Sequence, residues 1–459
     1  MPTPAITKTL RLFSIAIFLC CCTLAPAAEA PDPKCPNVIF ILSDDLGYGD
    51  LGCYGQKKIK TPNIDRIAAE GMRFTQAYAG CTVCAPSRCS LMTGLHTGHS
   101  TIRGNGSPEV PLRADELCVA EVFKAAGYST ALIGKWGVGE NGTSGAPNKK
   151  GFDFFFGYLT QVAAHNYYPP FIWRNTEKFP LEGNADGKKG VYTHDLFMNE
   201  ALKYVRENRE HPFFLYLPLT IPHANNEAKP NGMQVPSDAP YADETWPPVE
   251  KNFAAMITRM DSGIGTLMAS LKELGIDERT LVIFTSDNGP HNEGGHNASF
   301  FNSGGPLRGI KRDLYDGGIR MPAVARWPGR IAAGQVSDQV WAFWDFLPTM
   351  SELLGQKPPA NIDGVSILPA LLEQKNVERA PLYWEFHERG FSQAVRKGDW
   401  KAVRPGLQKP LELYDLNKDI SEKNDVAEQH PDVMAQMETY LKTARTDSEN
   451  FPIQKAGKK

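Results

Sequence analysis

Short apolar runs alternate with longer amphipathic segments between residues 37 and 285. The first run, residues 37–42, is rich in β-branched side chains and ends in the polar triplet Ser43-Asp44-Asp45. Continuous apolar runs of this length are typical of strands buried on both faces of a parallel sheet. Further strands are predicted at 129–133, 213–219 and 281–285, and helices at 62–71, 117–126, 196–207 and 253–274. This alternation predicts a largely parallel sheet that is covered by helices on both faces.

The helix predicted at 62–71 has clear signals at both ends. Thr61 stands at the cap position, Pro62 at the first helical position, and Gly71 after the last apolar residue. Proline is tolerated at the first position because its missing N–H would have no partner there, and glycine favours a helix end.

The pattern changes after about residue 354. Pro358-Pro359 marks a break, and shorter, partly alternating runs follow at 382–386, 392–396, 400–403 and 411–416, with a last helix at 432–443. Alternating runs are typical of antiparallel strands. We therefore predict a main α/β domain at 34–370 and a C-terminal subdomain with an antiparallel sheet and a helix at 371–459.

The first 27 residues predict a cleaved secretory signal. Lys8 and Arg11 precede an apolar stretch at 12–24, and small residues at 25–28 allow cleavage after Ala27. The apolar stretch is shorter than the roughly 20 residues that span a bilayer. We therefore expect export to the periplasm or the extracellular space. Cleavage as a lipoprotein beside Cys20–Cys22 is the alternative, and no later stretch predicts a transmembrane segment.

Composition and charge restrict the class of function. Apolar residues make up 42% of the chain and charged residues 22%, with a net charge of −3. Such a balance gives no electrostatic reason to expect nucleic acid or an anionic membrane as a partner. An anionic substrate would need local positive charge.

Polar residues closely follow four predicted strands: Asp44-Asp45, Lys135, His223 and Asp287-Asn288. Ligands of open α/β sheets bind outside the carboxyl ends of the strands, so we expect these clusters to meet at one edge. An isolated Asp-Asp pair is more often a capping feature, but adjacent carboxylates repel unless a cation or protons separate them. Three carboxylates and an amide oxygen suit a hard cation, either Ca²⁺ or Mg²⁺.

Six of the nine cysteines lie outside the predicted signal: Cys35, Cys53, Cys81, Cys84, Cys89 and Cys118. Their pairing cannot be read from the sequence. Cys81 and Cys84 have the spacing of a redox pair or of half a zinc site, but no second cysteine pair or histidine cluster completes such a site.

The run Cys84-Ala85-Pro86-Ser87-Arg88, followed by Leu91-Met92-Thr93-Gly94, resembles the nucleophile motif of type I sulfatases, in the alkaline phosphatase superfamily. Other motifs of this family have counterparts at 37–50, 61–66, 134–136, 222–223, 286–289, 308–311 and 316–320. The resemblance runs from about residue 37 to residue 370, and 412–416 resembles the family's C-terminal sheet. It implies an alkaline-phosphatase-like fold, with a mostly parallel central sheet flanked by helices and a small C-terminal α+β subdomain with an antiparallel sheet.

The resemblance also implies a mechanism and its cofactors. Cys84 would be converted by a maturation enzyme to formylglycine, whose hydrated aldehyde attacks the sulfur. Asp44, Asp45, Asp287 and Asn288, together with residue 84, would hold Ca²⁺, which stabilises charge on the transferred group. Arg88 would orient the nucleophile, Lys135 and Lys311 would bind sulfate oxygens, and His223 would donate a proton to the leaving alcohol.

The chain departs from the family's pattern at Gly137. Many members carry a histidine two residues after the lysine, and that histidine assists release of sulfate from the enzyme. Our hypothesis is that His165 takes over part of this work or binds substrate. His296, beside Asn292 and Glu293, is a second candidate substrate contact.

These features predict an enzyme that hydrolyses sulfate esters, with a sulfated carbohydrate as the natural substrate and aryl sulfate esters as model substrates. One alternative is a formylglycine-dependent phosphodiesterase or phosphonate monoester hydrolase of the same superfamily. Another is a catalytically impaired glycan-binding homologue, suggested by Gly137.

Overall fold

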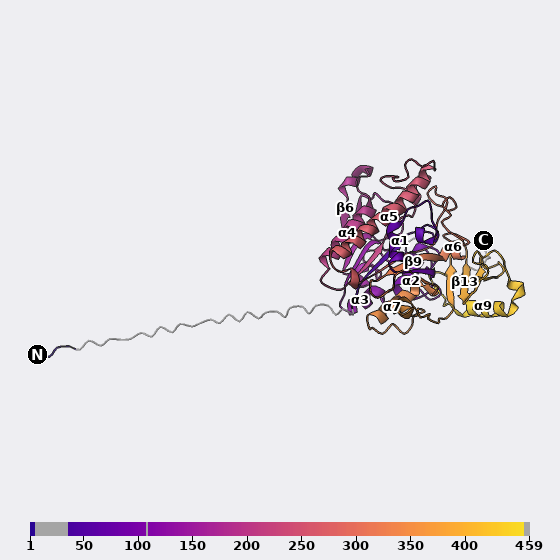
Figure 1. Ribbon diagram of the computed structural model, residues 1–459. Coiled ribbons are helices and arrows are strands. Elements are labelled where there is room, and N and C mark those ends of the chain that lie inside the picture. Colours follow the sequence, from indigo (N-terminus) through magenta and orange to yellow (C-terminus); the bar gives the residue numbers. More distant parts are fainter. Residues whose placement is uncertain (5–34, 107–108, 454–459) are drawn as a thin grey trace.

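The computed structural model describes residues 1–4, 35–106 and 109–453. Its core is one large twisted sheet with helices on both faces, beside a smaller sheet near the C-terminus (Figure 1). The predicted signal falls largely on residues 5–34, outside the described residues, as does the end of the chain from 454. Within the described ranges, no helix is both long and apolar enough to cross a membrane.

The large sheet has the strand order β10-β2-β9-β8-β1-β7-β3-β4-β5-β6, and β11 pairs with β2. Its strands are β1 (Asn37–Ser43), β2 (Met72–Tyr78), β3 (Ser129–Lys135), β4 (Phe154–Tyr158), β5 (Phe171–Arg174), β6 (Glu177–Pro180), β7 (Phe213–Pro218), β8 (Thr280–Ser286), β9 (Arg320–Arg326), β10 (Gln335–Ser337) and β11 (Trp341–Ala342). The central strands β8, β1, β7, β3 and β4 are parallel, as the sequence predicted. Their carboxyl ends therefore lie at one edge of the sheet.

Two apolar cores cover the two faces of this sheet. The helices are α1 (Pro62–Ala69), α2 (Cys84–Thr93), α3 (Val119–Ala125), α4 (Thr193–Glu207), α5 (Pro248–Glu273), α6 (Asp316–Ile319), α7 (Phe346–Leu353), α8 (Leu368–Leu372) and α9 (Pro431–Thr443). Helices α1, α4 and α5 pack on one face, and α2, α3 and α7 pack on the other. Burial on both faces explains why the central strands are continuous apolar runs.

The structure differs from the prediction at both ends of the helix at 62–71: the Thr61 side chain does not cap it, and Gly71 lies beyond its end. Thr61 Oγ1 donates to Asp65 Oδ1 at 3.1 Å and accepts from the Gly52 N–H at 2.8 Å, and caps no helix N–H. The helix ends at Ala69, and a Cβ at Gly71 would lie 2.2 Å from the carbonyl oxygen of Ala325. Glycine at 71 therefore permits the close approach of β9.

The small sheet is antiparallel, as predicted, with the order β12-β13-β14-β15. Its strands are β12 (Leu382–Phe386), β13 (Ser392–Lys397), β14 (Trp400–Arg404) and β15 (Glu412–Asp415). Lys401 reaches from β14 to Asp316 at 2.7 Å and to Glu422 at 2.9 Å, and all three side chains are buried. This network ties the small sheet to α6, which follows Lys311. The predicted domain boundary at residue 370 stays a prediction.

Candidate active site

The structure brings the predicted strand-end residues together at the carboxyl edge of the parallel sheet. Asp44 and Asp45 follow β1, Lys135 is the last residue of β3, His223 lies beyond β7, and Asp287 and Asn288 follow β8. Strands β1 and β8 are neighbours in register, with Ser43 opposite Ser286. The two acidic segments therefore meet, and the N–H of Asp45 donates to Asp287 Oδ1 at 3.1 Å.

Cys84 is the first residue of α2 and faces this acidic pair. Its Sγ lies 3.3 Å from Asp44 Oδ1, and the residue is 2% exposed. Burial and the charge of Asp44 raise the pKa of this thiol well above its ordinary value. Because the thiolate is the reactive form of cysteine, an unmodified Cys84 would be a poor nucleophile at neutral pH. Cys81 lies nearby but is not bonded to it, and all six cysteines in the described part of the chain are free.

Arg88, one helical turn after Cys84, is fully buried beneath the site. Its Nε and Nη2 donate to Asp287 Oδ2 at 3.0 and 2.8 Å, and Nη1 donates to the carbonyl of Lys135 at 2.7 Å. Nη2 also lies 3.5 Å from Asp44 Oδ2. The guanidinium thus joins α2 to the ends of three strands.

Two buried lysines face the two adjacent aspartates. Lys135 Nζ donates to Asp44 Oδ2 at 2.7 Å, and Lys311 Nζ donates to Asp45 Oδ2 at 2.8 Å. Burial alone would raise the pKa of each aspartate, but the lysines and His223 lower both pKa values below the ordinary range. Burial lowers the pKa of each lysine, but the neighbouring carboxylates raise it by more. The pKa of both lysines therefore lies above its ordinary value. These four groups are therefore charged at neutral pH.

The acidic cluster fits a hard cation. Asn288 Oδ1 is buried and has no hydrogen-bond partner among the described residues, while Asn288 Nδ2 lies 2.6 Å from Asp45 Oδ1. Asn288 Nδ2 also donates to the Gly289 carbonyl at 3.1 Å, which fixes the amide orientation and leaves Oδ1 as a buried oxygen available to a cation. Burial, together with the charge of Asp44, raises the pKa of Asp287 to about 7. A bound cation would favour the ionised form of this carboxyl.

His223 is buried beside Lys311 and Asp45. Its Nδ1 lies 2.7 Å from the Ala224 carbonyl and its Nε2 lies 2.9 Å from Lys311 Nζ, so the neutral ring donates at Nδ1 and accepts at Nε2. Burial and the charge of Lys311 lower the pKa of His223 to about 3. The ring is therefore neutral in the absence of an anionic ligand.

The two histidines that the sequence offered as substrate contacts occupy different surroundings. His165, in the short 3-10 helix Ala163–His165, stacks on His223 with ring centroids 4.7 Å apart and contacts Glu227 at 3.2 Å. His296 stacks on Phe253, and its Nδ1 lies 2.6 Å from Glu250. His165 thus adjoins the site, whereas the side chain of His296 is fully buried. The substrate role of each stays a prediction.

Glu293 and Arg312 extend the site on the side of Lys311. Glu293 Oε2 accepts from Lys311 Nζ at 3.1 Å and from Asn226 Nδ2 at 3.1 Å, and Glu293 also forms an ion pair with Arg312. Arg312 reaches Glu388 of the C-terminal subdomain at 3.2 Å and has a φ of +78°. Our sequence reasoning missed Arg312, because an arginine beside a lysine carries no motif of its own.

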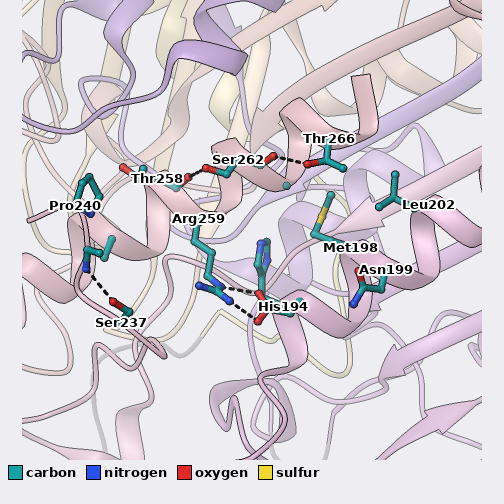
Figure 2. Close-up of a pocket in the computed structure, with 14 residues that line it drawn as sticks. His194, Met198, Asn199, Leu202, Ser237, Pro240, Thr258, Arg259, Ser262 and Thr266 are labelled. Atoms are coloured by element: carbon teal, nitrogen blue, oxygen red, sulfur yellow. Dashed lines mark hydrogen bonds and ion pairs between the residues drawn. The ribbon is translucent and has the colours of Figure 1, made fainter. Parts of the chain in front are cut away.

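A surface hollow of about 630 Å³ lies elsewhere, between α4 and α5 (Figure 2). Arg259 and Asp195 form a bidentate ion pair within it, and His194, Met198 and Ser262 are among its lining residues. None of the predicted site residues lines it.

The sequence matches the family described as Sulfatase over residues 36–356, and residues 310–447 match the family of N-sulphoglucosamine sulphohydrolase C-terminal regions. The N-acetylgalactosamine-6-sulfatase of Rattus norvegicus is 34% identical over 409 residues, which cover 82% of this chain and 72% of the relative. The N-acetylgalactosamine-6-O-sulfatase of Bacteroides thetaiotaomicron is 28% identical and covers 90% of this chain and 93% of the relative.

Solved structures agree with these matches. The structure of Ps i-CgsB in complex with k-i-k-neocarrahexaose has a TM-score of 0.79 and 30% identity, covering 91% of this chain and 95% of that one. The phosphonate monoester hydrolase of Agrobacterium radiobacter has a TM-score of 0.65 and 22% identity, covering 92% of this chain and 100% of that one. At that identity the second likeness concerns the fold alone.

Calcium is expected to raise the melting temperature of the chelator-treated protein, because the cation would bind a site that exists only in the folded chain. Free calcium at a hundred times its Kd would add about 2.7 kcal/mol to the free energy of unfolding. Differential scanning fluorimetry with and without calcium measures the shift, and magnesium in its place compares the two cations. Asp45→Asn should lose the shift and Asp195→Asn should keep it. Equal shifts in both variants would contradict the assignment.

Proposed function

Because the chain belongs to the sulfatase family, we propose that it removes sulfate from sulfated sugars with residue 84 as its nucleophile. Membership makes the chain a sulfuric ester hydrolase. The observation that carries the proposal is the arrangement around Cys84, where three carboxylates and three cationic side chains meet in a buried site. A divalent cation would add two positive charges to this balanced set and make the site attractive to an anion.

The proposed nucleophile is formylglycine, made from Cys84 by a maturation enzyme. The motif at 84–88 and the raised pKa of the Cys84 thiol support this conversion. Hydrated formylglycine supplies a hydroxyl that can attack sulfur and a second hydroxyl that allows the aldehyde to re-form. Arg88, four residues later on α2, holds its charge beside residue 84 and stabilises an ionised oxygen there.

The proposed cofactor is Ca²⁺, held by Asp44, Asp45, Asp287 and Asn288, with residue 84 beside them. The bound cation would stabilise negative charge on the transferred group. The unpartnered Oδ1 of Asn288 and the pKa of about 7 for Asp287 support such a ligand set.

Lys135 and Lys311 are proposed to bind the sulfate oxygens. Each ammonium is fixed by a carboxylate at 2.7 or 2.8 Å, on the Asp44 and Asp45 sides of the site respectively. Fixed charges of this kind stabilise negative charge in a transition state without having to reorganise.

His223 is proposed to donate the proton that the leaving alcohol needs. Without substrate its Nε2 accepts from Lys311. The negative charge of a bound sulfate ester favours the protonated imidazole, and the contact with Lys311 gives the proton a source. His165 stacks on this ring and is proposed to contact the substrate on the leaving-group side. His296 is also proposed as a substrate contact; its ring is stacked on Phe253.

The sugar class of the substrate is supported by the relatives. Two of them are named for N-acetylgalactosamine 6-sulfate, and one neighbouring structure holds a neocarrahexaose.

Export is also proposed, from the order of charged, apolar and small residues at 8–28. N-terminal sequencing of the mature protein should find a start near residue 28, and an intact Met1 would contradict export with cleavage.

The enzyme is expected to hydrolyse the sulfate ester of a phenol with a kcat/KM at least about tenfold above that for the phosphate ester, a difference of about 1.4 kcal/mol. Colorimetric assays measure both, and a panel of sulfated mono- and oligosaccharides then identifies the natural sugar. Cys84→Ala should release no sulfate. Faster cleavage of the phosphate or phosphonate ester would favour the phosphodiesterase alternative, and no turnover of any ester would favour the binding homologue.

His165→Ala is expected to lower kcat/KM for a sulfated sugar by about tenfold or more, about 1.4 kcal/mol, because the variant loses a ring that packs on His223. Steady-state assays and the burst of phenol from an aryl sulfate measure the effect. Glu227→Gln, which changes only the partner of His165, should have a smaller effect. A variant with the burst and the turnover of the parent would rule out a role for His165.

A further inference from the structure

Gly137, where many family members have a histidine, is covered by the side chain of Gln161. Gly137 has a φ of +76°, and its carbonyl accepts from Gln161 Nε2 at 3.0 Å. A Cβ at position 137 would lie 1.9 Å from that same nitrogen. Gln161 therefore fills the space in which a side chain at 137 would begin.

The loop that carries Gln161 is held against β3 by backbone hydrogen bonds. The N–H of Trp136 donates to Tyr158 at 2.9 Å, and the N–H of Gly137 donates to Leu159 at 3.0 Å. Gln161 is 6% exposed, and its Oε1 has no hydrogen-bond partner within the described ranges. Since Nε2 faces a carbonyl, the amide orientation is fixed and Oε1 is left as a buried acceptor.

A carboxyl group adjoins this amide. Glu109 Oε1 accepts from the backbone N–H of Gln161 at 2.5 Å, while Glu109 Oε2 is buried and has no partner in the part of the chain that the structure describes. Four residues earlier, Asn105 Oδ1 accepts from the N–H of Ala85 at 3.0 Å, next to residue 84. Glu109 thus contacts the loop that covers Gly137, and Asn105 contacts the first turn of the helix that carries residue 84.

Two charged groups act on Glu109 besides its burial. Burial raises the pKa of this carboxyl most, the hydrogen bond from the Gln161 N–H and the charge of Lys135 lower it, and Glu140 raises it, so that the pKa lies at about 7. A carboxyl with such a pKa can take up and release a proton at neutral pH, as a histidine can.

We propose that Glu109, held in place by Gln161, accepts the proton that the missing histidine would otherwise take when sulfate is released. The proton would leave the free hydroxyl of residue 84 for Oε2 of Glu109; the oxygen of that hydroxyl forms the C=O double bond of the aldehyde, the C–O bond to the sulfate breaks, and sulfate departs with the bonding electrons. The proton would pass from Glu109 to solvent. This inference rests on the proposed function. His165 is less suited to the step, because its ring packs on His223 and Glu227, on the leaving-group side.

The test compares Glu109→Gln with the parent enzyme on an aryl sulfate. Glutamine keeps an oxygen for the Gln161 N–H but cannot take a proton, so the fold should be preserved. We expect the burst of phenol to remain, steady-state kcat to fall by about a hundredfold, and the acidic limb of the kcat profile near pH 7 to disappear. Glu109→Asp should restore part of the turnover. Glu140→Gln, which removes an exposed neighbouring carboxylate, should match the parent.

A second readout needs no turnover. In Cys84→Ala protein, the infrared carboxyl band that titrates between about pH 6 and about pH 8 should lose one component when Glu109→Gln is added. Asp287 and Glu422 also have pKa values of about 7, so the component is identified by the difference between the two proteins.

The outcomes separate the two proposals. If the parent turns over sulfate esters and Glu109→Gln does so equally, with the same pH profile and the same infrared titration, the role of Glu109 is wrong and the proposed function stands. If the parent turns over no sulfate ester, the proposed function fails, while the infrared titration still reports whether Glu109 carries the proton.

Discussion

Three carboxylates buried at the ends of two adjacent strands are the constraint on which the site depends. Asp44, Asp45 and Asp287 meet because β1 and β8 pair in parallel register. Burying an ionised carboxylate costs several kcal/mol unless opposite charge and hydrogen bonds compensate. The opposite charge comes from Arg88 on α2, Lys135 on β3 and Lys311 in the loop before α6. The ion pairs of these three side chains therefore hold α2, β3 and that loop against the ends of β1 and β8.

The same constraint explains how the site can receive both a cation and an anion. Three acidic and three basic groups balance one another, so the proposed divalent cation would leave the site with a net positive charge, which would suit a sulfate ester. The small C-terminal sheet contributes by fixing α6 through Lys401 and Asp316, which positions the chain that follows Lys311. Glu388, in the connection between β12 and β13, contacts Arg312 beside the site.

Much of this arrangement could be predicted from the sequence, because buried parallel strands have a continuous apolar pattern and their polar ends mark the site. Helix α2 could not, since all ten of its residues are buried and it has no polar face to give a helical period. The edge strands β6 and β10, and β5 beside β6, are short and partly exposed, so they have no continuous apolar pattern. Gln161 and Glu109 were missed because their position depends on two loops that meet only in the folded chain. The sequence shows that position 137 lacks the histidine, but it does not show that the Gln161 side chain occupies the space beside Gly137.

The most direct test of the account is mass spectrometry of the peptide that contains residue 84, made on enzyme whose turnover of a sulfate ester has been measured. The account predicts the aldehyde mass at residue 84, in a fraction that rises and falls with specific activity across preparations with and without a maturation enzyme. A fully active preparation in which residue 84 is unmodified cysteine would contradict it.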